Sequence, residues 1–302
     1  MPEHGSDGAC PTCGWSTSSQ NCCSYSSHVK LFYGADERGV WALGSDMILK
    51  ERPNSLPRNE ALNVDFIRSC TTIPAPSIFR EWIDSSDRYF LLMERMKGQT
   101  LRAAWSTLSL PQKNNIADQV ATAIQQLRRL QSPIIQSLDG GPVYSGWLFL
   151  NGSKTPYGPF LSDADLRSSL VGALKSLPPE AVSRFQARVP ECTPYTFTHG
   201  DLNCENIIVE DGQLVGILDW EYAGYFPVWW EYVAISIGLS SEDAEWKSLL
   251  RERLSSHQAA REFWVDLYSL SMYPDLDERG QYLLRSLLEE QKDSSGNCAD
   301  IL

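Results

Sequence analysis

The chain has 302 residues, of which 42% are hydrophobic and 21% are charged, and it carries a formal net charge of −12. This composition is typical of a folded globular protein and excludes a disordered chain. The acidic balance argues against nucleic acid and anionic membranes as partners.

The amino-terminal residues 1–27 are rich in Ser, Gly and Cys. Cys10 and Cys13 have the spacing of a zinc knuckle or a redox pair, but Cys22 and Cys23 are adjacent instead of forming a second such pair. We therefore expect a flexible tail, and a zinc or redox site remains the alternative.

No apolar run of signal-peptide length begins the chain, and the longest apolar stretch, residues 226–239, contains Glu231 and is too short to span a bilayer. We therefore expect a cytoplasmic protein with no membrane partner. Residues 240–302 carry 13 acidic and 7 basic side chains. This excess favours a solvated helix surface, although it could also attract a cationic substrate.

Short apolar runs between glycine turns predict a small antiparallel sheet at the start of the chain. A helix over residues 57–70, with Leu62, Phe66 and Ile67 on one face, interrupts this sheet and ends before the Pro74-Ala-Pro76 segment. The predicted strands are 29–33, 40–43, 47–50, 78–83 and 89–93.

After Gly98 the pattern is mostly helical, beginning with an amphipathic helix over residues 111–131 and ending with helices from 228 to 288. Three short strands lie between them, at residues 195–198, 207–209 and 214–218, and Asp211-Gly212 forms a hairpin turn. The sequence therefore predicts an α+β fold with a β-rich lobe over residues 28–97 and an α-rich lobe over 98–302.

Three polar residues follow or precede these short strands at a spacing suited to phosphoryl transfer. Asn206 comes five residues after Asp201, and Asp219 comes thirteen residues later. Phosphoryl transfer requires a carboxylate that accepts the proton of the attacking hydroxyl and oxygen ligands that hold Mg²⁺ on the nucleotide phosphates. Asp201 fits the first role, whereas Asn206 and Asp219 fit the second.

The segments His199-Gly-Asp-Leu-Asn-Cys-Glu-Asn-Ile-Ile208 and Ile217-Leu-Asp-Trp-Glu-Tyr-Ala-Gly224 carry a family resemblance. They match the HGDxxxxNI and DWExAGxxP patterns, so residues 28–240 resemble the aminoglycoside phosphotransferase-like family, in the branch common in fungi. The resemblance implies a bilobal protein-kinase-like fold and an ATP- and Mg²⁺-dependent enzyme.

Carried over to this chain, the resemblance implies that Asp201 is the catalytic base and that Asn206 and Asp219 bind Mg²⁺. It also implies that His199 belongs to the catalytic loop, where we favour a bracing role over proton transfer. Glu231 would brace the same loop. Glu205 adds a carboxylate beside Asn206, which could alter metal preference or, as we favour, face solvent.

In the amino-terminal lobe, the resemblance assigns nucleotide contacts to four residues. Lys50 would hold the α- and β-phosphates, and Glu60 would pair with it, since the neighbouring Glu51 points to the other face of the strand. The backbone around Glu94 and Met96 would hydrogen-bond adenine. There is no GxGxxG motif, so we assign the phosphate-covering loop loosely to residues 34–44.

The acceptor is expected to be a small hydroxylated metabolite, with a cationic one as a special case. Gly200 stands where protein kinases commonly have Arg, and too few residues follow Asp219 for a peptide-docking activation loop. An aromatic cluster near Asp219 could contact the acceptor, but we favour packing; it consists of Trp220, Tyr222, Tyr225, Phe226, Trp229 and Trp230. The alternatives are a catalytically silent kinase-like module and a zinc-dependent interaction protein.

Overall fold

The computed structural model describes residues 28–35, 37–152 and 154–289. The cysteines at positions 10, 13, 22 and 23 lie outside these residues. The expectations of a flexible tail and of a zinc site therefore concern a segment outside the described residues. The chain groups into two compact units. The first contains the described residues up to Asn54 together with Phe79–Arg95, and the second contains Ser55–Ile78 and the described residues from Met96 onward.

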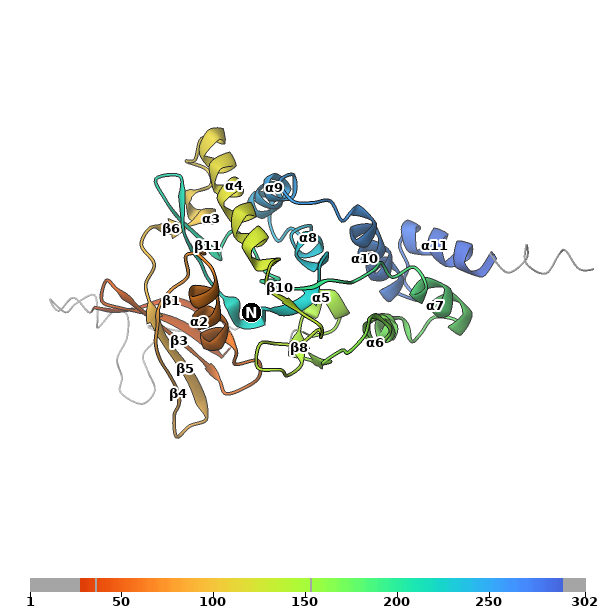
Figure 1. Cartoon of the computed structure of the whole chain (residues 1–302), viewed down its shortest axis with the longest axis horizontal. Coiled ribbons are helices and arrows are strands. Elements are labelled where there is room, and N and C mark those ends of the chain that lie inside the picture. Colours follow the sequence, from red (N-terminus) through yellow and green to blue (C-terminus); the bar gives the residue numbers. More distant parts are fainter. Residues whose placement is uncertain (1–27, 36, 153, 290–302) are drawn as a thin grey trace, which may run out of the picture. The chain divides into compact units, whose positions relative to one another are not determined.

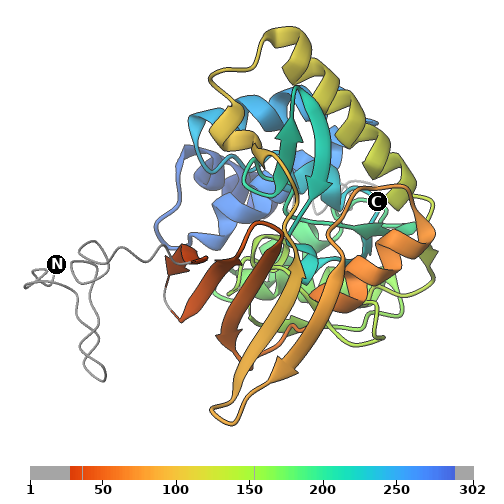
Figure 2. The same cartoon turned by 90° about the vertical axis from the view of Figure 1, so that its left-hand side faces the viewer.

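The first unit is built on a five-stranded sheet with the strand order β1-β2-β3-β5-β4, visible in Figure 2. Strand β3 is central and pairs antiparallel with both β2 and β5. The strands are β1 (Val29–Ala35), β2 (Arg38–Leu43), β3 (Met47–Pro53), β4 (Ile78–Ile83) and β5 (Arg88–Glu94). These bounds confirm the predicted strands to within a few residues.

Alternating side chains give this sheet its buried face. Ala42, Leu91 and Met93 are almost inaccessible to solvent. At its far end, the Arg52 guanidinium lies 4.9 Å from the centre of the Tyr89 ring, and Trp82 stacks on Phe90 at 5.1 Å between centroids. Cation–π and aromatic contacts of this kind stabilise this end of the sheet.

Helix α2 (Glu60–Cys70) groups with the second unit, although we expected residues 28–97 to form one lobe. Its buried face also differs from the expected one, because Leu62 is 45% exposed and Asn63 is fully buried. The reason is a pair of hydrogen bonds that the Asn63 Nδ2 amide donates to the carbonyls of Trp220 (2.7 Å) and Ala223 (3.2 Å). A polar side chain thus fixes the helix rotation.

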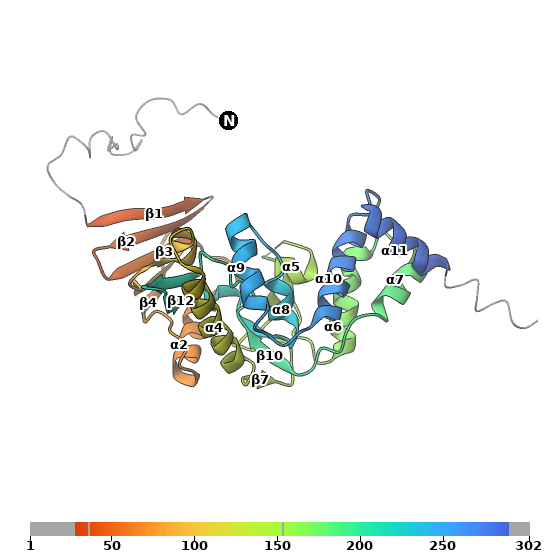
Figure 3. The ribbon, with the colours of Figure 1, turned by 90° about the horizontal axis from the view of Figure 1, so that it is seen from above.

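The rest of the second unit is mainly helical (Figure 1). Its helices are α3 (Leu101–Ala104), α4 (Leu110–Leu127), α5 (Gly146–Phe149), α6 (Asp163–Leu170), α7 (Pro179–Gln186), α8 (Trp230–Ala234), α9 (Ser241–Arg251), α10 (Gln258–Ser271) and α11 (Glu278–Glu289), with 3₁₀ turns at Val171–Leu174 and Trp220–Tyr222. Figure 3 shows α10 and α11 side by side with α7.

Short strands join the helical layers of the second unit. One sheet has the order β13-β10-β7 and another β12-β11-β6, while β8 pairs with β9. The strands are β6 (Gln99–Thr100), β7 (Gln131–Ser132), β8 (Val143–Tyr144), β9 (Pro156–Tyr157), β10 (Tyr195–Thr198), β11 (Ile207–Glu210), β12 (Gln213–Ile217) and β13 (Gly224–Pro227).

Two apolar cores support these elements. One lies among α6, α7, α8, α10 and α11, and the other joins α2, α4 and α9 to β10, β11 and β12. Trp220, Trp229, Trp230 and Trp246 are among the largest fully buried side chains. Within the part of the chain that the structure describes, no helix has the length and apolarity needed to cross a membrane.

Candidate active site

The β11–β12 hairpin brings two of the expected metal ligands to one corner of the second unit. Ile207 pairs with Ile217, and the Leu218 N–H donates to the Asn206 carbonyl at 2.8 Å. Asn206 therefore lies across the hairpin from Leu218, the residue that precedes Asp219 in the chain. Asp219 adopts φ +63 and ψ +56, a left-handed conformation that is uncommon for a residue with a side chain and concentrates at functional sites.

The Asp201 carboxylate is held by two side-chain amides. Asn203 Nδ2 donates to its Oδ1 at 2.8 Å, and Asn206 Nδ2 donates to its Oδ2 at 3.2 Å. Asn206 Nδ2 also donates to the Asp201 carbonyl at 2.9 Å. Each carboxylate oxygen accepts one amide hydrogen bond, which fixes the orientation of the group and leaves further lone pairs for a substrate proton.

His199 has the geometry of a brace and not of a proton shuttle. Its ring is fully buried and lies edge-on to Trp220, with centroids 4.6 Å apart. The Asp201 N–H donates to Nδ1 at 3.2 Å, so Nδ1 must be the unprotonated acceptor. The other ring nitrogen, Nε2, then donates to the Leu218 carbonyl at 2.9 Å. The imidazole therefore links the loop that carries Asp201 to Leu218, the residue before Asp219.

Glu231, at the start of α8, makes the contact that the family resemblance implies. Its carboxylate accepts hydrogen bonds from the backbone N–H groups of His199 (2.7 Å) and Gly200 (3.1 Å). Burial raises the pKa of Glu231, although these hydrogen bonds and the charge of Arg128 act in the opposite direction. Gly200 has φ +80, a conformation that glycine adopts without strain.

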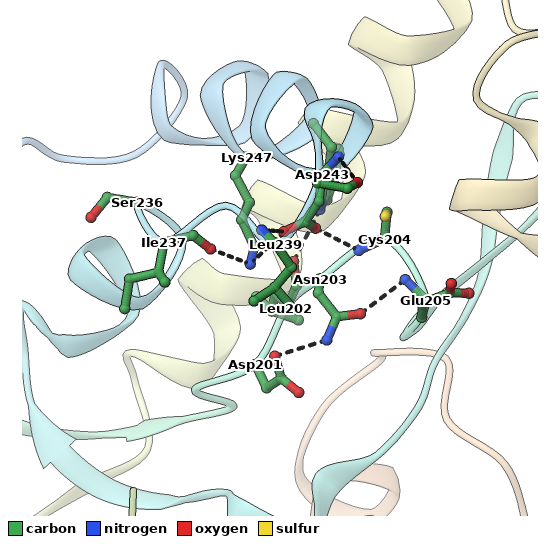
Figure 4. A network of polar contacts seen from close by, with 12 residues as sticks. Asp201, Leu202, Asn203, Cys204, Glu205, Ser236, Ile237, Leu239, Asp243 and Lys247 are labelled. Carbon is green, nitrogen blue, oxygen red and sulfur yellow. Dashed lines mark hydrogen bonds and ion pairs between the residues drawn. The ribbon is translucent and has the colours of Figure 1, made fainter. Parts of the chain in front are cut away.

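Helix α9 also holds this loop, and Figure 4 shows Asp243 and Lys247 of the helix beside Leu202, Asn203 and Cys204. The Cys204 N–H donates to Asp243 Oδ1 at 3.0 Å, and Trp246 Nε1 donates to the Leu202 carbonyl at 3.0 Å. Asp243 stands in the first turn of α9, where Ser240 caps the helix by accepting from the Asp243 N–H. A carboxylate at this end is favoured by the helix dipole.

The second oxygen of Asp243 forms a buried ion pair. Lys247 Nζ lies 2.8 Å from Asp243 Oδ2, and the two side chains are only 5% and 2% exposed. Lys247 also donates to the Ile237 carbonyl at 2.8 Å, and the Leu239 N–H donates to Asp243 Oδ2 at 3.0 Å. Both charges are therefore compensated, which a buried pair requires.

Asn206 and Asp219 have the donor chemistry that Mg²⁺ prefers, because both offer oxygen ligands. The Asn206 amide nitrogen is engaged with Asp201, so its oxygen is the atom able to bind a cation. Two protein ligands suffice for an ion whose other ligands are phosphate oxygens and water. Glu205 is exposed and pairs with Arg102 at 3.1 Å, which agrees with the expectation that it faces solvent.

A cavity of about 370 Å³ opens beside Asp201 in the second unit. Its walls come from β8, α5, the catalytic loop, the Trp220–Tyr222 turn, β13 and α8. The lining residues are Tyr144, Ser145, Gly146, Trp147, Gly200, Asp201, Tyr222, Phe226 and Trp230. The volume is that of a small-molecule site, and the carboxylate of the expected base forms part of its wall.

The aromatic cluster that follows Asp219 divides between cavity wall and core. Tyr222, Phe226 and Trp230 line the cavity. Trp220 and Trp229 are buried in the apolar cores, and Tyr225 packs edge-on against Phe197 at 5.3 Å. Packing is therefore observed for Trp220, Trp229 and Tyr225, and contact with an acceptor stays a prediction for the three residues that line the cavity.

The four nucleotide-contact residues divide between the two units. Lys50 lies on the central strand β3, whereas Glu51 pairs with Arg88 at 2.9 Å and accepts from Trp41, so Glu51 is committed to neighbours within the sheet. Glu94 ends β5.

In the second unit, Glu60 is buried at the start of α2. The Met96 side chain lies against Gly216, where an added methyl group would approach it to 3.0 Å. In the first unit, Gly34 and Gly39 face each other across the β1–β2 hairpin. The nucleotide roles of these residues stay predictions.

Four residues of the site are not foreseen from the sequence. Asn203 and Asp243 hold the loop, and Tyr144 and Trp147 line the cavity. Asn203 lies inside the recognised motif, so its position was a usable signal. Asp243 lies far along the chain from the motif, and Tyr144 and Trp147 lie in a segment with no periodic pattern, so only the tertiary fold reveals them.

Comparison with known proteins places the chain in a family. The model of the phosphotransferase enzyme family matches residues 34–264. This match extends over parts of both units and includes all the site residues described above. The chain belongs to the phosphotransferase enzyme family. A search of curated proteins finds no match to the sequence.

Solved structures with the same fold include aminoglycoside phosphotransferases. A thermostable mutant of APH(4)-Ia, in a ternary complex with ADP and hygromycin B, is 14% identical with a TM-score of 0.55, over 90% of this chain and 95% of that one. APH(2")-IIia, in complex with GDP and kanamycin, is 17% identical with a TM-score of 0.53, over 91% and 95% of the two chains. The likeness confirms the α+β kinase-like fold.

Proposed function

We propose that this phosphotransferase moves the γ-phosphate of ATP to a hydroxyl group of a small molecule, with Mg²⁺ held by Asn206 and Asp219. The observation that carries the proposal is the Asp201 carboxylate, which two amides orient within the wall of a small-molecule-sized cavity. A carboxylate so held is suited to accept a hydroxyl proton.

In the proposed reaction, a hydroxyl of the acceptor donates a hydrogen bond to the Asp201 carboxylate. Its oxygen forms a bond to the γ-phosphorus while the bond between that phosphorus and the bridging oxygen of ADP breaks, and the hydroxyl proton passes to Asp201. Mg²⁺, when bound, would neutralise charge on the phosphate oxygens. His199 and Glu231 hold the loop backbone, so Asp201 keeps its orientation as the proton arrives.

The nucleotide side of the proposal rests on the family and on the residues of the first unit. Lys50 would hold phosphate, Glu60 would support Lys50, and the backbone at Glu94 and Met96 would bind adenine. The solved neighbours with ADP and with GDP support a nucleotide as phosphate donor. Their aminoglycosides, hygromycin B and kanamycin, support a small hydroxylated acceptor, of which a cationic compound is one candidate.

The test is magnesium-dependent binding of ATP and GTP by the purified protein, measured as a shift in melting temperature. We expect a shift that requires Mg²⁺ and that Asp219→Ala abolishes, since the variant lacks one of the two protein oxygen ligands. Asp201→Asn is the matched control, because it keeps the metal ligands and should keep the shift while losing phosphate transfer. A folded wild-type protein that shows no shift would point instead to a catalytically silent module.

A further inference from the structure

The cavity beside Asp201 has an unusual balance of aromatic and charged groups. Five of the nine residues that line it are aromatic, and Asp201 is the only carboxylate among them. Because Asp201 is committed to the acceptor hydroxyl, no second carboxylate in the described lining remains to pair with an ammonium group. A ligand with several positive charges would therefore lose hydration there without gaining ionic partners.

A second cavity, of about 700 Å³, adjoins the first through Gly146 and Trp147, which line both. Aromatic side chains again contribute to its wall, including Phe149, Tyr157 and Tyr268. The only charged side chain in its described lining is Lys175. The described lining of this second cavity thus contains no negative charge for a polycation.

Trp230 forms part of the buried wall of the same cavity. Its ring is 1% exposed, and its indole N–H has no hydrogen-bond partner among the described residues. This N–H lies 3.5 Å from the position that a methyl group on Gly200 would occupy, next to Asp201 in the chain. Because this N–H is itself inaccessible to solvent, Trp230 contributes apolar surface to the cavity wall and no accessible donor.

Tyr144 also belongs to the lining and carries a phenolic hydroxyl. Burial, together with the nearby Asp139 carboxylate, raises the pKa of Tyr144, so its hydroxyl stays protonated at neutral pH. Trp147, in contrast, is 46% exposed and forms the accessible edge between the two cavities. The described lining of the cavity therefore combines flat aromatic side chains, the Tyr144 hydroxyl and one carboxylate, that of Asp201.

From these groups we infer that the acceptor is a hydroxyl compound with an aromatic or otherwise apolar body, carrying at most one positive charge. The inference rests on the proposed phosphotransferase function and narrows its substrate class. The hydroxyl binds Asp201, and the apolar body lies against Trp147 and Phe226.

The test is a comparison of two series of alcohols, with dissociation constants measured by ligand-observed NMR in the presence of Mg²⁺ and ADP. In the first series, benzyl alcohol and 2-naphthalenemethanol differ in apolar area. In the second, ethanolamine, 1,3-diamino-2-propanol and kanamycin carry an increasing number of ammonium groups. We expect roughly fivefold tighter binding of the naphthalene compound than of benzyl alcohol, and no tightening along the second series.

Trp147→Ala should abolish the preference for the larger ring, and Trp147→Phe should largely keep it. Tyr282→Ala is the matched surface control, because Tyr282 is 71% exposed on α11 and lines neither cavity. Affinity that rises with ammonium number, or no binding of the aromatic series while Mg²⁺-ADP still binds, overturns the inference and leaves the proposed function standing. Failure of Mg²⁺-ADP to bind counts against the proposed function itself.

Discussion

The carboxylate of Asp243 accepts a hydrogen bond from the backbone N–H of Cys204, so the first turn of α9 is tied to the loop that carries Asp201. Trp246, one helical turn further on, contacts the same loop because its indole N–H donates to the Leu202 carbonyl. Two successive points of the loop are thus fixed by one helix. The residues of α9 that support the loop are therefore different from Asp201, the residue proposed to carry out its chemistry.

The first prediction concerns the charge of Asp243. Asp243→Asn leaves the Lys247 ammonium buried without a counter-charge, and we expect a loss of about 3–5 kcal/mol in the free energy of unfolding, measured by urea denaturation. The double variant Asp243→Leu/Lys247→Met removes both charges and should be more stable than the single variant. The double variant should also transfer phosphate about tenfold more slowly, because leucine offers Cys204 no acceptor, whereas Asp243→Asn keeps an amide oxygen for that hydrogen bond. A double variant with the wild-type rate would show that the contact does not position the loop.

A second prediction concerns Gly98, which has φ +93 and lies against β11. A methyl group there would approach the Val209 carbonyl oxygen to 2.4 Å. We expect Gly98→Ala to lower the free energy of unfolding by more than about 2 kcal/mol, from backbone strain and the clash together. Gly140→Ala is the control, because Gly140 has φ +81 but no atom within 4 Å of the added methyl. Equal losses in the two variants would mean that the approach to Val209 costs nothing.

The third prediction is a pH dependence that arises from Glu231. Its carboxyl has a pKa above its ordinary value of 4.5 because of burial. Above pH 4.5 the folded protein therefore retains this proton where the unfolded chain has lost it, and the stability contributed by the group falls as pH rises. Glu231→Gln lacks this term.

The measurement for Glu231 is the melting temperature of wild type and Glu231→Gln at several pH values from 4.5 upward to 7. Other titrating groups cancel in the difference between the two proteins. We expect the advantage of the wild type to shrink as pH rises through this range. An advantage that grows with pH would mean that the hydrogen bonds from His199 and Gly200, and not burial, dominate the pKa of Glu231.

A fourth prediction concerns thiol reactivity. Cys70 is exposed, whereas burial raises the pKa of Cys192 to about 12 and that of Cys204 to about 11. Because the thiolate is the reactive form, iodoacetamide at pH 8 should label Cys70 at least tenfold faster than Cys192 or Cys204 in the folded protein. Peptide mapping by mass spectrometry measures this, with labelling in urea as the control. Rapid labelling of Cys204 would indicate that the catalytic loop opens.

The sequence predicts the strands and the hairpin of the site well, because local patterns determine them. The Asp211-Gly212 turn has φ +51 and φ +74 at its two residues, as an Asp-Gly hairpin turn requires. The rotation of α2 is not predictable in this way, since buried Asn63 donates hydrogen bonds to carbonyls that are more than 150 residues away in the sequence. Apolar periodicity places Leu62 on the buried face, because such a pattern contains no information about a polar side chain whose hydrogen-bond partners are distant in the sequence.

The same distinction applies to the site. Asp201, Asn206 and Asp219 lie within one short segment, so their spacing carries the signal. The role of Asp243 depends on the packing of α9 on the loop, and the cavity wall gathers Tyr144, Trp147 and Trp230 from three elements. No local pattern encodes such an assembly. The acidic carboxy-terminal region that suggested a cationic ligand contributes no carboxylate to the described cavity lining.

The division of the site between a short hairpin segment and distant walls has a consequence for how the protein can change. Residues 199–219 carry the base and the proposed metal ligands, whereas Tyr144 and Trp147 in β8 and α5 shape the cavity. Under the proposed function, substitutions at positions 144 and 147 would therefore alter which acceptor is bound without changing the contacts that hold Asp201. Selectivity can drift in such an enzyme while its chemistry stays constant, and related chains with identical hairpins can serve different metabolites.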